Sequence, residues 1–294
     1  MIIKGLYDGI SCGMVAAKVS GLKVDKYMAY EIDEDAIKVS KHNHPEIIHM
    51  GDVFSAVHEY GDCDLLIGGS PCTYWSIANV NGREIKSEGL GWDLFNEYVR
   101  ALNESNPKYF LYENNQSMKD DIKNEITKAL GVEPIMINSA DFSAQERKRY
   151  YWTNIPVAAW EPKNINFSDI MESEAEFIYR DISKYRETYK YSRDGSVIKW
   201  DTGGKGHYSQ ANRAKKAENK WYTVCASRAE SKGNVWIDDN TIRLVTMTEL
   251  ERLQTLPDGY TSILRSKEKR GKGIGNGWTV DVIAHIFKGL QGGI

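Results

Sequence analysis

The sequence predicts an α/β protein built on a doubly wound, Rossmann-like sheet of mostly parallel strands, with a smaller, irregular and mostly β region after it. In the N-terminal half, short apolar runs alternate with helical patterns, which is typical of a doubly wound fold. After residue 157 this alternation fades, and Lys, Ser, Tyr and Trp become frequent. We therefore expect a first domain at 1–157, a second region at 158–242, and a return segment at 243–294 that completes the first domain.

The apolar runs locate the expected strands. They lie at residues 2–7, 27–30, 47–50, 65–67, 109–112 and 135–138. A helix is expected to begin at Met14, directly after a turn that contains Gly9 and Gly13, and another is expected at 93–105. These elements follow one another closely enough for a single sheet with helices packed on it.

Composition excludes several classes of protein. The four cysteines are Cys12, Cys63, Cys72 and Cys225, and they form no C-x-x-C pair, so neither a metal site nor a disulfide framework is predicted. No apolar run approaches the ~20 residues needed to cross a bilayer, and the N-terminus does not read as a signal peptide. We expect an intracellular protein with no membrane partner.

Acidic residues end the first three expected strands. They are Asp8, Glu31 and Asp52, and Glu31 lies 22 residues after Gly9. A glycine turn brings the backbone close to a ligand, and an acid at the end of the second strand is suited to a ribose diol. Asp52 is placed to accept from an adenine amino group. The pattern predicts an adenosine-binding half-sheet, and the absence of G-x-G-x-x-G makes a dinucleotide the weaker alternative.

Cys72 follows the fourth expected strand. The apolar run 65–67 is followed by Gly68 and Gly69, and Pro71 stiffens the turn just before the cysteine. A lone thiol would then stand at the carboxyl end of a central strand, where open α/β sheets bind ligands. It is either a nucleophile or a structural cysteine, since free Cys is often buried. Residues 73–92 are expected to form a mobile loop near it.

Three further charged residues are candidates. Glu113 follows the strand at 109–112, and a parallel neighbour would set it close to Cys72, with the two groups acting on one substrate; the alternative is an ordinary exposed acid. If a strand begins at Arg149, then Arg147 and Arg149 share a face suited to a phosphate, a carboxylate or a base carbonyl. A structural ion pair is the alternative.

Charge is distributed unevenly along the chain. Residues 1–157 carry 16 Lys and Arg against 23 Asp and Glu, whereas residues 158–294 carry 22 against 18. The segment 199–232 holds 8 basic and 3 acidic residues, interleaved with Trp and Tyr. Such a segment predicts a nucleic-acid-binding face, with a solvated loop as the alternative. Beyond it, 243–256 reads as an amphipathic helix, and 273–279 reads as a glycine turn that opens a helix at 280–290 and cradles a small ligand.

Six blocks of sequence, in this order, resemble the cytosine-C5 DNA methyltransferases along nearly the whole chain. They are 6–13, 68–72 with its Pro71-Cys72 pair, Glu113-Asn114, Gln145-x-Arg147-x-Arg149, 243–257 and 275–282. Stretches such as Ser76-Ile77-Ala78-Asn79 and Tyr150-Tyr151-Trp152 are most similar to the catalytic domains of animal de novo methyltransferases. With no chromatin-reading domain in front, we expect a bacterial or phage enzyme of the cytoplasm, with a restriction endonuclease as a possible companion.

The resemblance implies S-adenosyl-methionine as the methyl donor. Glu31 would bind its ribose, Ile32 would lie against the adenine, and Asp52 and Val53 would contact the adenine edge. The remaining residues of the implied donor site are Tyr7, Asp8, Gly9, Ile10, Cys12, Gly69, Pro71, Leu94, Asn276 and Trp278. The chain departs from the family at Ser11 and Cys12, where glycine is frequent, and at Asn115, where the Glu-Asn motif usually continues with Val.

The resemblance also implies covalent catalysis on a cytosine flipped out of duplex DNA. Cys72 would add to C6, which turns C5 into a nucleophile. Glu113, protonated, would donate to N3; Arg149 would hold O2, and Arg147 would support the loop or the region of Cys72. Flipping costs a few kcal/mol, and the loop that contains Ser76 would close over the base. Arg228 would read a neighbouring guanine, the usual partner of arginine.

Other readings remain open. A tRNA cytosine methyltransferase would share the catalytic set. A non-catalytic DNA-binding paralogue would be expected to lack Cys72, Glu113 or Arg149, and all three are present. A small-molecule methyltransferase would leave the basic aromatic segment unexplained.

Overall fold

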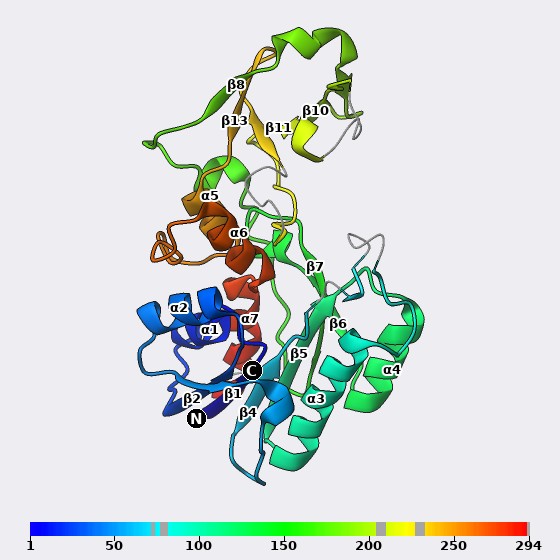
Figure 1. Ribbon diagram of the computed structural model, residues 1–294, viewed down its shortest axis with the longest axis vertical. Coiled ribbons are helices and arrows are strands. Elements are labelled where there is room, and N and C mark those ends of the chain that lie inside the picture. The colour runs from blue at the N-terminus through cyan, green and yellow to red at the C-terminus, as the bar shows by residue number, and fades with distance from the viewer. Residues whose placement is uncertain (72–73, 77–81, 204–209, 227–232, 293–294) are drawn as a thin grey trace. The chain divides into compact units, whose positions relative to one another are not determined.

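The computed structural model describes residues 1–71, 74–76, 82–203, 210–226 and 233–292 (Figure 1). The chain divides into two compact units. The first contains 1–138, 148–160 and 280–294, and the second contains 139–147 and 161–279. The expected boundary near 157 therefore falls close to the end of a segment of the first unit. The return segment differs from expectation, because only its last part, from Val280 onward, belongs to the first unit.

The first unit is organised around a seven-stranded sheet, which confirms the predicted fold class. The strand order is β3-β2-β1-β4-β5-β7-β6, and only β7 runs antiparallel to its neighbours. The strands are β1 (Ile2–Leu6), β2 (Lys26–Tyr30), β3 (Ile48–Gly51), β4 (Leu65–Gly68), β5 (Tyr109–Asn115), β6 (Ile135–Asn138) and β7 (Lys148–Thr153). The carboxyl ends of β1 to β5 therefore meet at one edge, where Asp8, Glu31, Asp52 and Glu113 lie.

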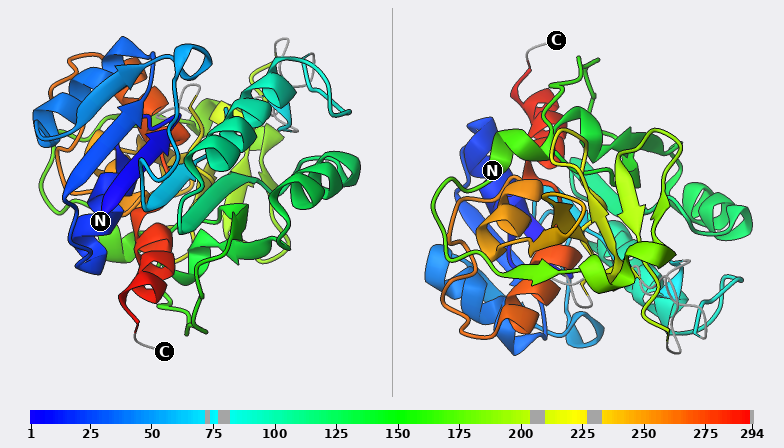
Figure 2. Two further views of the ribbon diagram at one scale, coloured as in Figure 1. Left: turned by 90° about the horizontal axis from the view of Figure 1, so that it is seen from below. Right: turned by 90° about the horizontal axis from the view of Figure 1, so that it is seen from above.

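Helices cover the two faces of this sheet. Apolar side chains of α3 and α4 share a buried core with Leu66, Phe110 and Trp152 of the strands. Helix α1 packs against α7, and Figures 1 and 2 show these two together, apart from α3 and α4. The bounds are α1 (Cys12–Ser20), α2 (Glu34–Asn43), α3 (Leu90–Ser105), α4 (Asp120–Leu130) and α7 (Val280–Lys288), with a 3-10 turn η1 (Val53–Ser55) after β3.

Two elements of the first unit extend beyond their expected bounds. Helix α3 begins at Leu90, three residues before the expected start, because the Glu84 carboxylate accepts from the Gly91 N–H and so satisfies a group of the first turn. Strand β5 continues to Asn115, because β7 pairs with its last residues. Glu113 and Asn114 are thus strand residues and do not follow the strand.

The second unit contains a six-stranded sheet in the order β8-β13-β12-β11-β10-β9, in which only β11 and β12 pair in parallel. It confirms the predicted mostly β region. Its strands are β8 (Tyr179–Asp181), β9 (Lys190–Tyr191), β10 (Val197–Lys199), β11 (Arg213–Lys215), β12 (Asn234–Trp236) and β13 (Thr241–Leu244). Helices α5 (Met247–Leu253) and α6 (Lys267–Asn276) complete it, and their apolar side chains share a core with Phe167 and Trp221.

Two sequence expectations for this unit were wrong. Residues 243–256 are not one helix: Arg243 and Leu244 end β13, and α5 begins only after Thr246, whose capping box with Glu249 sets its start. The glycine turn expected at 273–279 is helical up to Asn276. A Cβ on Gly275 would lie 2.3 Å from the backbone N of Ala226, so this glycine allows a helix to touch a neighbouring backbone. The ligand cradle expected in this stretch stays a prediction.

Within the described segments, no helix is long and apolar enough to cross a membrane. The same segments hold no group of three or more His, Cys, Asp and Glu side chains that could bind a metal ion.

A buried ion pair links β13 to α5. The two terminal nitrogens of the Arg243 guanidinium donate to the two Glu249 carboxylate oxygens, at 2.9 and 2.7 Å, and both residues are at most 1% exposed. We expect Arg243→Met to lower the free energy of unfolding by about 3 kcal/mol, because the Glu249 charge stays buried without its partner. Urea unfolding checks this. Lys184→Met, at an exposed position of the same unit, is the control and should change stability by less than about 0.5 kcal/mol; equal losses would contradict the prediction.

Candidate active site

The turn after β1 has an unusual backbone. Tyr7, Gly9 and Ser11 all adopt positive φ values, of 58°, 57° and 62°. Left-handed conformations are costly for residues other than glycine, so surrounding contacts must hold Tyr7 and Ser11 in place. A Cβ on Gly9 would meet no atom within 4 Å. The turn therefore leaves open space beside the half-buried Gly9 at the carboxyl edge of the sheet.

Glu31 holds this turn against the end of β2. One carboxylate oxygen accepts from the Gly9 N–H at 2.8 Å, and the other accepts from the N–H groups of Ile32 and Asp33, both at 2.8 Å. Next to it, the Ile32 side chain is 69% exposed. The strand end therefore carries a carboxylate fixed by three backbone donors and flanked by an exposed apolar side chain, and the ribose and adenine contacts expected of these two residues stay predictions.

The Asp8 carboxylate is hydrogen-bonded inside the turn and does not point into the open space beside Gly9. One of its oxygens accepts from the Tyr27 hydroxyl and the other from the Ser11 hydroxyl, each at 2.5 Å. Burial is the main cause that raises the pKa of Asp8, to about 6. Ser11, the departure from the family's glycine, thus has a partner in Asp8, and Asp8 acts as an internal support of the turn.

The raised pKa predicts that Asp8 makes stability depend on pH. The folded protein binds this proton more tightly than the unfolded chain, so the contribution is full below the ordinary pKa near 4 and is lost as the pH rises through 6. Asp8→Asn keeps the shape without the charge. The free energy of unfolding of Asp8→Asn minus that of wild type is therefore expected to increase by about 2 kcal/mol from pH 4 to pH 7, because the wild type loses the contribution of the Asp8 proton. Urea unfolding of both proteins across this range is the measurement, and a constant difference would refute the assignment.

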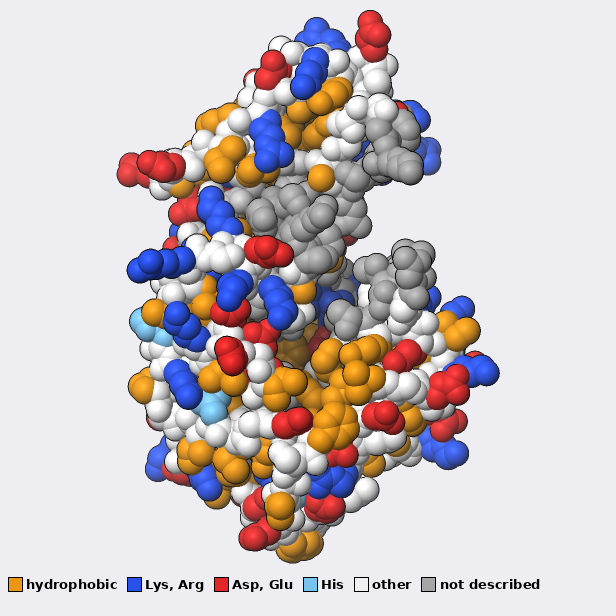
Figure 3. All heavy atoms as spheres, viewed as in Figure 1, with side chains coloured by type: hydrophobic (Ala, Val, Ile, Leu, Met, Phe, Trp, Pro, Cys, Tyr) orange, Lys and Arg blue, Asp and Glu red, His pale blue; other side chains and the backbone are white. Residues whose placement is uncertain are grey.

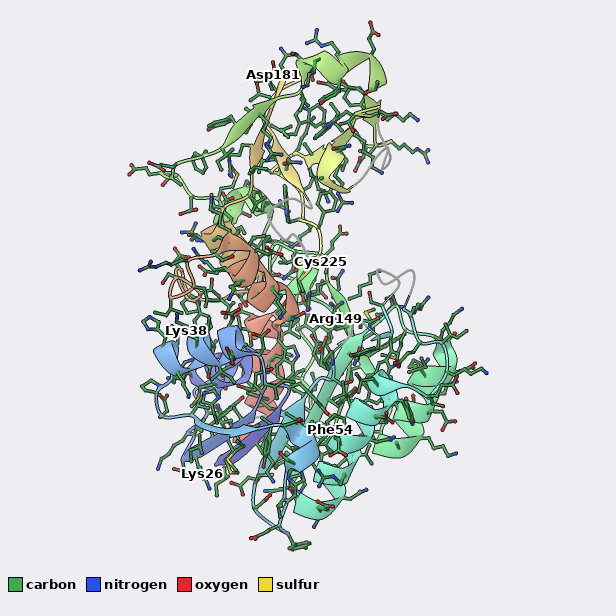
Figure 4. All side chains as sticks on the ribbon, viewed as in Figure 1. Lys26, Lys38, Phe54, Arg149, Asp181 and Cys225 are labelled. Atoms are coloured by element: carbon green, nitrogen blue, oxygen red, sulfur yellow. The ribbon has the colours of Figure 1, made fainter. Side chains whose placement is uncertain are left out.

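The other predicted donor-site residues of the first unit differ in exposure. Asp52 is exposed and caps η1 through the Phe54 N–H at 3.1 Å, and Phe54 itself is 50% exposed (Figure 4). The Tyr7 hydroxyl donates to the Leu94 carbonyl at 2.5 Å, and burial raises the pKa of this tyrosine.

The remaining predicted donor-site residues of this unit lie near β4 or inside the core. Gly69 is half-buried and Pro71 is exposed at the end of β4. Three side chains are almost completely buried, those of Ile10, Cys12 and Val53.

Phe54 is a candidate that the sequence analysis missed. The sequence feature that could have identified it is an apolar residue two positions after Asp52, the acid at the end of the third strand. Figure 3 shows hydrophobic side chains gathered between acidic ones on the surface of the first unit. Asn276 and Trp278 belong to the second unit, so their part in the donor site stays a prediction.

Glu113 and Arg149 form an ion pair between neighbouring strands. Glu113 lies on β5 and is 7% exposed, so the alternative of an ordinary exposed acid was wrong. Arg149 lies on β7, opposite Asn115, and its Nε is 2.9 Å from a Glu113 carboxylate oxygen. Its Nη1 also donates to the Lys148 carbonyl at 2.8 Å. The pair sets one donor-rich and one acceptor-rich group side by side at the carboxyl end of β5.

Arg147 has different surroundings from Arg149. It is 4% exposed, belongs to the second unit, and donates to the carbonyls of Val224 and Gly277, both at 3.1 Å. Strand β7 begins only at Lys148, so the expected shared face of the two arginines is not formed as a pair of strand neighbours. Arg147 instead holds together two loops of its own unit.

The turn toward Cys72 is described up to Pro71. Cys72 and Arg228 lie outside the described residues, so their predicted roles stay predictions. Ser70 is 3% exposed and lies 2.7 Å from the Tyr112 hydroxyl, and its carbonyl accepts from the Asn114 amide at 3.1 Å. The sequence analysis did not select Ser70 or Tyr112. The feature that could have identified the contact is the hydroxyl group of Tyr112 within an otherwise apolar strand.

The described parts of the segment 73–92 have firm contacts. Trp75 is completely buried, its indole N–H donates to Glu84 at 3.2 Å, and Arg83 donates to the Ser117 carbonyl at 2.5 Å. Ser76, the predicted DNA contact, is half-buried directly after Trp75. Mobility and DNA contact in this segment both stay predictions.

Comparisons with known proteins agree on one family. The family model described as C-5 cytosine-specific DNA methylase matches residues 5–292. The type II methyltransferase M.FnuDI of Fusobacterium nucleatum is 25% identical, over 90% of this chain and 87% of the relative. The orphan methyltransferase M.SPRI of Bacillus phage SPR is 30% identical over 51% of this chain and 36% of its own. The solved structure of the S. pombe Dnmt2 methyltransferase has a TM-score of 0.68 and 15% identity, over 98% of this chain and 97% of that one.

Proposed function

Because this chain belongs to the C-5 cytosine-specific DNA methylase family, we propose that it transfers a methyl group from S-adenosyl-methionine to C5 of a flipped cytosine in duplex DNA. The observation that carries the proposal is the buried ion pair of Glu113 and Arg149 at the carboxyl end of β5. A carboxyl group and a guanidinium side by side suit the N3–O2 edge of cytosine, which presents two neighbouring acceptors.

The residues at the ends of β1, β2 and β3 fit the proposed donor. Glu31 is already oriented by three backbone N–H groups and can accept from a ribose hydroxyl as well. The exposed Ile32 and Phe54 provide apolar surface for an adenine ring, and the exposed Asp52 an acceptor for its amino group. When bound, S-adenosyl-methionine supplies an electrophilic methyl group on a positively charged sulfur.

In the proposed mechanism the Cys72 thiolate forms a bond to C6 of cytosine. The electron pair released in the ring makes C5 nucleophilic. C5 would form a bond to the methyl carbon of the bound donor as the S–CH3 bond breaks, with S-adenosyl-homocysteine as the leaving group. When the base enters, we propose that the Glu113–Arg149 ion pair opens and Glu113 takes up a proton from solvent. Glu113 then donates to N3 while Arg149 donates to O2, so both neutralise charge that develops on the ring. A base, water or a side chain, then takes the C5 proton. The electrons of the C5–H bond form the C5=C6 double bond as the S–C6 bond breaks, so the thiolate is regenerated, Glu113 recovers its proton from N3, and 5-methylcytosine is released.

We propose that the second unit binds DNA, with Arg228 reading a guanine beside the target. One row of its sheet supports phosphate contacts. Lys190, Lys199 and Arg213 are directly opposite one another on β9, β10 and β11, so three basic residues lie in one row across these strands. Arg213 also stacks on Tyr222, with its guanidinium carbon 3.6 Å from the ring centroid. A phosphate backbone is the anion that fits such a row.

The row predicts a defined salt dependence. Lys199→Gln is expected to weaken binding to duplex DNA about equally for all sequences and to reduce the slope of log K against log salt by about 0.9. Fluorescence anisotropy at several salt concentrations measures both effects. Lys38→Gln, at an exposed position on α2 of the first unit (Figure 4), is the control and should leave the slope unchanged. An unchanged slope for Lys199→Gln would remove this residue from the DNA face.

One experiment tests the proposed function. The protein is incubated with labelled S-adenosyl-methionine and either duplex DNA or tRNA, and 5-methylcytosine is mapped by sequencing. We expect labelled C5-methylcytosine in duplex DNA at one sequence context. Label in tRNA alone would favour the tRNA methyltransferase, and DNA binding without label in either substrate would favour the non-catalytic paralogue. The mapped context also shows whether a companion restriction endonuclease of the same specificity should be sought.

A further inference from the structure

We propose that the Tyr112 hydroxyl is a positioning group for the active site: through Ser70, it holds the turn that leads to Cys72. The inference rests on the proposed function, because it assigns Cys72 as the group to be positioned. It adds residues that the methyl transfer described above does not use.

The ring of Tyr112 is a rigid base for such a contact. Tyr112 is completely buried on β5, where it pairs with Gly68 of β4. The rings of Phe95, Tyr98 and Trp152 surround it, with centroids 5.2, 4.8 and 5.9 Å away. Rotation of the ring would disturb all of these contacts, so the position of the hydroxyl is set by the core.

The hydroxyl reaches the turn directly. Tyr112 Oη lies 2.7 Å from Ser70 Oγ, and Ser70 is 3% exposed and two residues before Cys72 in the sequence. The Asn114 amide donates to the Ser70 carbonyl at 3.1 Å and to Tyr112 Oη at 3.3 Å. Because the Tyr112 oxygen accepts from Asn114, its O–H group is free to donate a hydrogen bond to Ser70 Oγ. The polar groups of Ser70, Tyr112 and Asn114 therefore satisfy one another inside the protein.

Asn115 fixes the orientation of this network. The side-chain oxygen of Asn114, Oδ1, accepts from the Asn115 backbone N–H at 2.8 Å and from the Asn115 side-chain amide at 3.1 Å. Asn115 in turn accepts from the Ser117 hydroxyl at 2.8 Å. These contacts turn the nitrogen of Asn114 toward Ser70.

Loss of the Tyr112 hydroxyl would leave Ser70 Oγ without its nearest partner at a buried site. The turn would then gain alternative positions, and a displacement of about 1 Å at a reacting group can cost ~100-fold in rate. Neither Tyr112 nor Ser70 is proposed to touch the DNA, so the effect should fall on the chemical step and not on the KM for DNA. Gly69 and Pro71, which flank Ser70, are predicted donor contacts, so the KM for the methyl donor reports how far the turn moves.

The test compares Tyr112→Phe with Tyr98→Phe. Tyr98 is equally buried in the same core, but its hydroxyl is 3.4 Å from the Leu66 carbonyl on β4 and does not reach the turn. Tyr112→Phe is expected to lower kcat by ~10- to 100-fold, with the KM for DNA within about threefold of wild type and with a melting temperature close to that of Tyr98→Phe. Tyr98→Phe should keep nearly full kcat. Equal kcat values for the two variants would overturn the inference.

A second pair of measurements separates positioning from general loosening of the core. Ser70→Ala should reproduce the loss of kcat, and the Tyr112→Phe/Ser70→Ala double variant should be no slower than either single variant. If Tyr112→Phe does not fold, Ser70→Ala alone carries the same expectation. In a Cys225→Ser background, Tyr112→Phe should also change the rate at which iodoacetamide alkylates Cys72, because Cys12 and Cys63 are buried. Multiplicative losses in the double variant, or an unchanged alkylation rate, would refute a shared contact.

The outcomes also separate this inference from the proposed function. If the wild-type protein methylates no cytosine, the proposed function fails and the kcat comparison falls with it. If the wild type is active and Tyr112→Phe retains its kcat, only the positioning role fails.

Discussion

Cys72→Ala is expected to abolish methyl transfer. Without a thiolate there is no addition to C6, and C5 of an unactivated cytosine is a poor nucleophile. Label from S-adenosyl-methionine should no longer enter duplex DNA. Duplex DNA that contains 5-fluorocytosine at the mapped site should form a covalent adduct with the wild type on a denaturing gel and none with the variant. DNA affinity, measured by anisotropy, should stay within about threefold, because phosphate contacts supply most of it.

Cys225→Ser is the matched control for this experiment. Cys225 is a partly exposed thiol of the second unit, and its loss should leave both methylation and trapping intact. Retained methylation in Cys72→Ala, or trapping lost in Cys225→Ser, would defeat the assignment of Cys72 as the nucleophile.

Glu113→Gln is expected to lower kcat by ~10²- to 10⁴-fold, the range typical of a general acid. Glutamine keeps the shape of the side chain and still lies beside Arg149, but it has no acidic proton to give to N3. The Arg149 charge also loses its carboxylate partner at 2.9 Å, which weakens the orientation of the guanidinium. Single-turnover rates under saturating DNA isolate this effect from binding.

Glu97→Gln is the control for Glu113→Gln. Glu97 also pairs with an arginine of the first unit, Arg100 on α3, at 2.6 Å. Its loss should change stability slightly and leave the single-turnover rate near wild type. A Glu113→Gln variant within tenfold of wild type would exclude Glu113 as the proton donor to the ring.

The comparisons name bacterial, phage and Dnmt2 methyltransferases. They support the family that the sequence blocks indicate, and the nearer likeness to animal de novo enzymes stays a prediction. The division of labour between the two units, with donor binding and catalysis in one and DNA recognition in the other, likewise belongs to the proposed function.

The sequence alone determined the parallel α/β sheet, the strand ends that carry Glu31 and Asp52, and the family. These features depend on local information: apolar runs set the strands, and glycine or acidic residues directly after them set the turns. The second, mostly β unit was equally visible, because the alternation of strand and helix patterns stops.

Only the tertiary structure decided which groups meet. Glu113 is buried against Arg149, Asp8 is turned toward Tyr27, and Tyr112 reaches Ser70, although each pair is separated by 19 residues or more. It also decided that 243–279 packs in the second unit and that Arg243 ends a strand. Such outcomes depend on which distant groups satisfy a buried charge or hydrogen bond, and the spacing of residues along the chain does not contain that information.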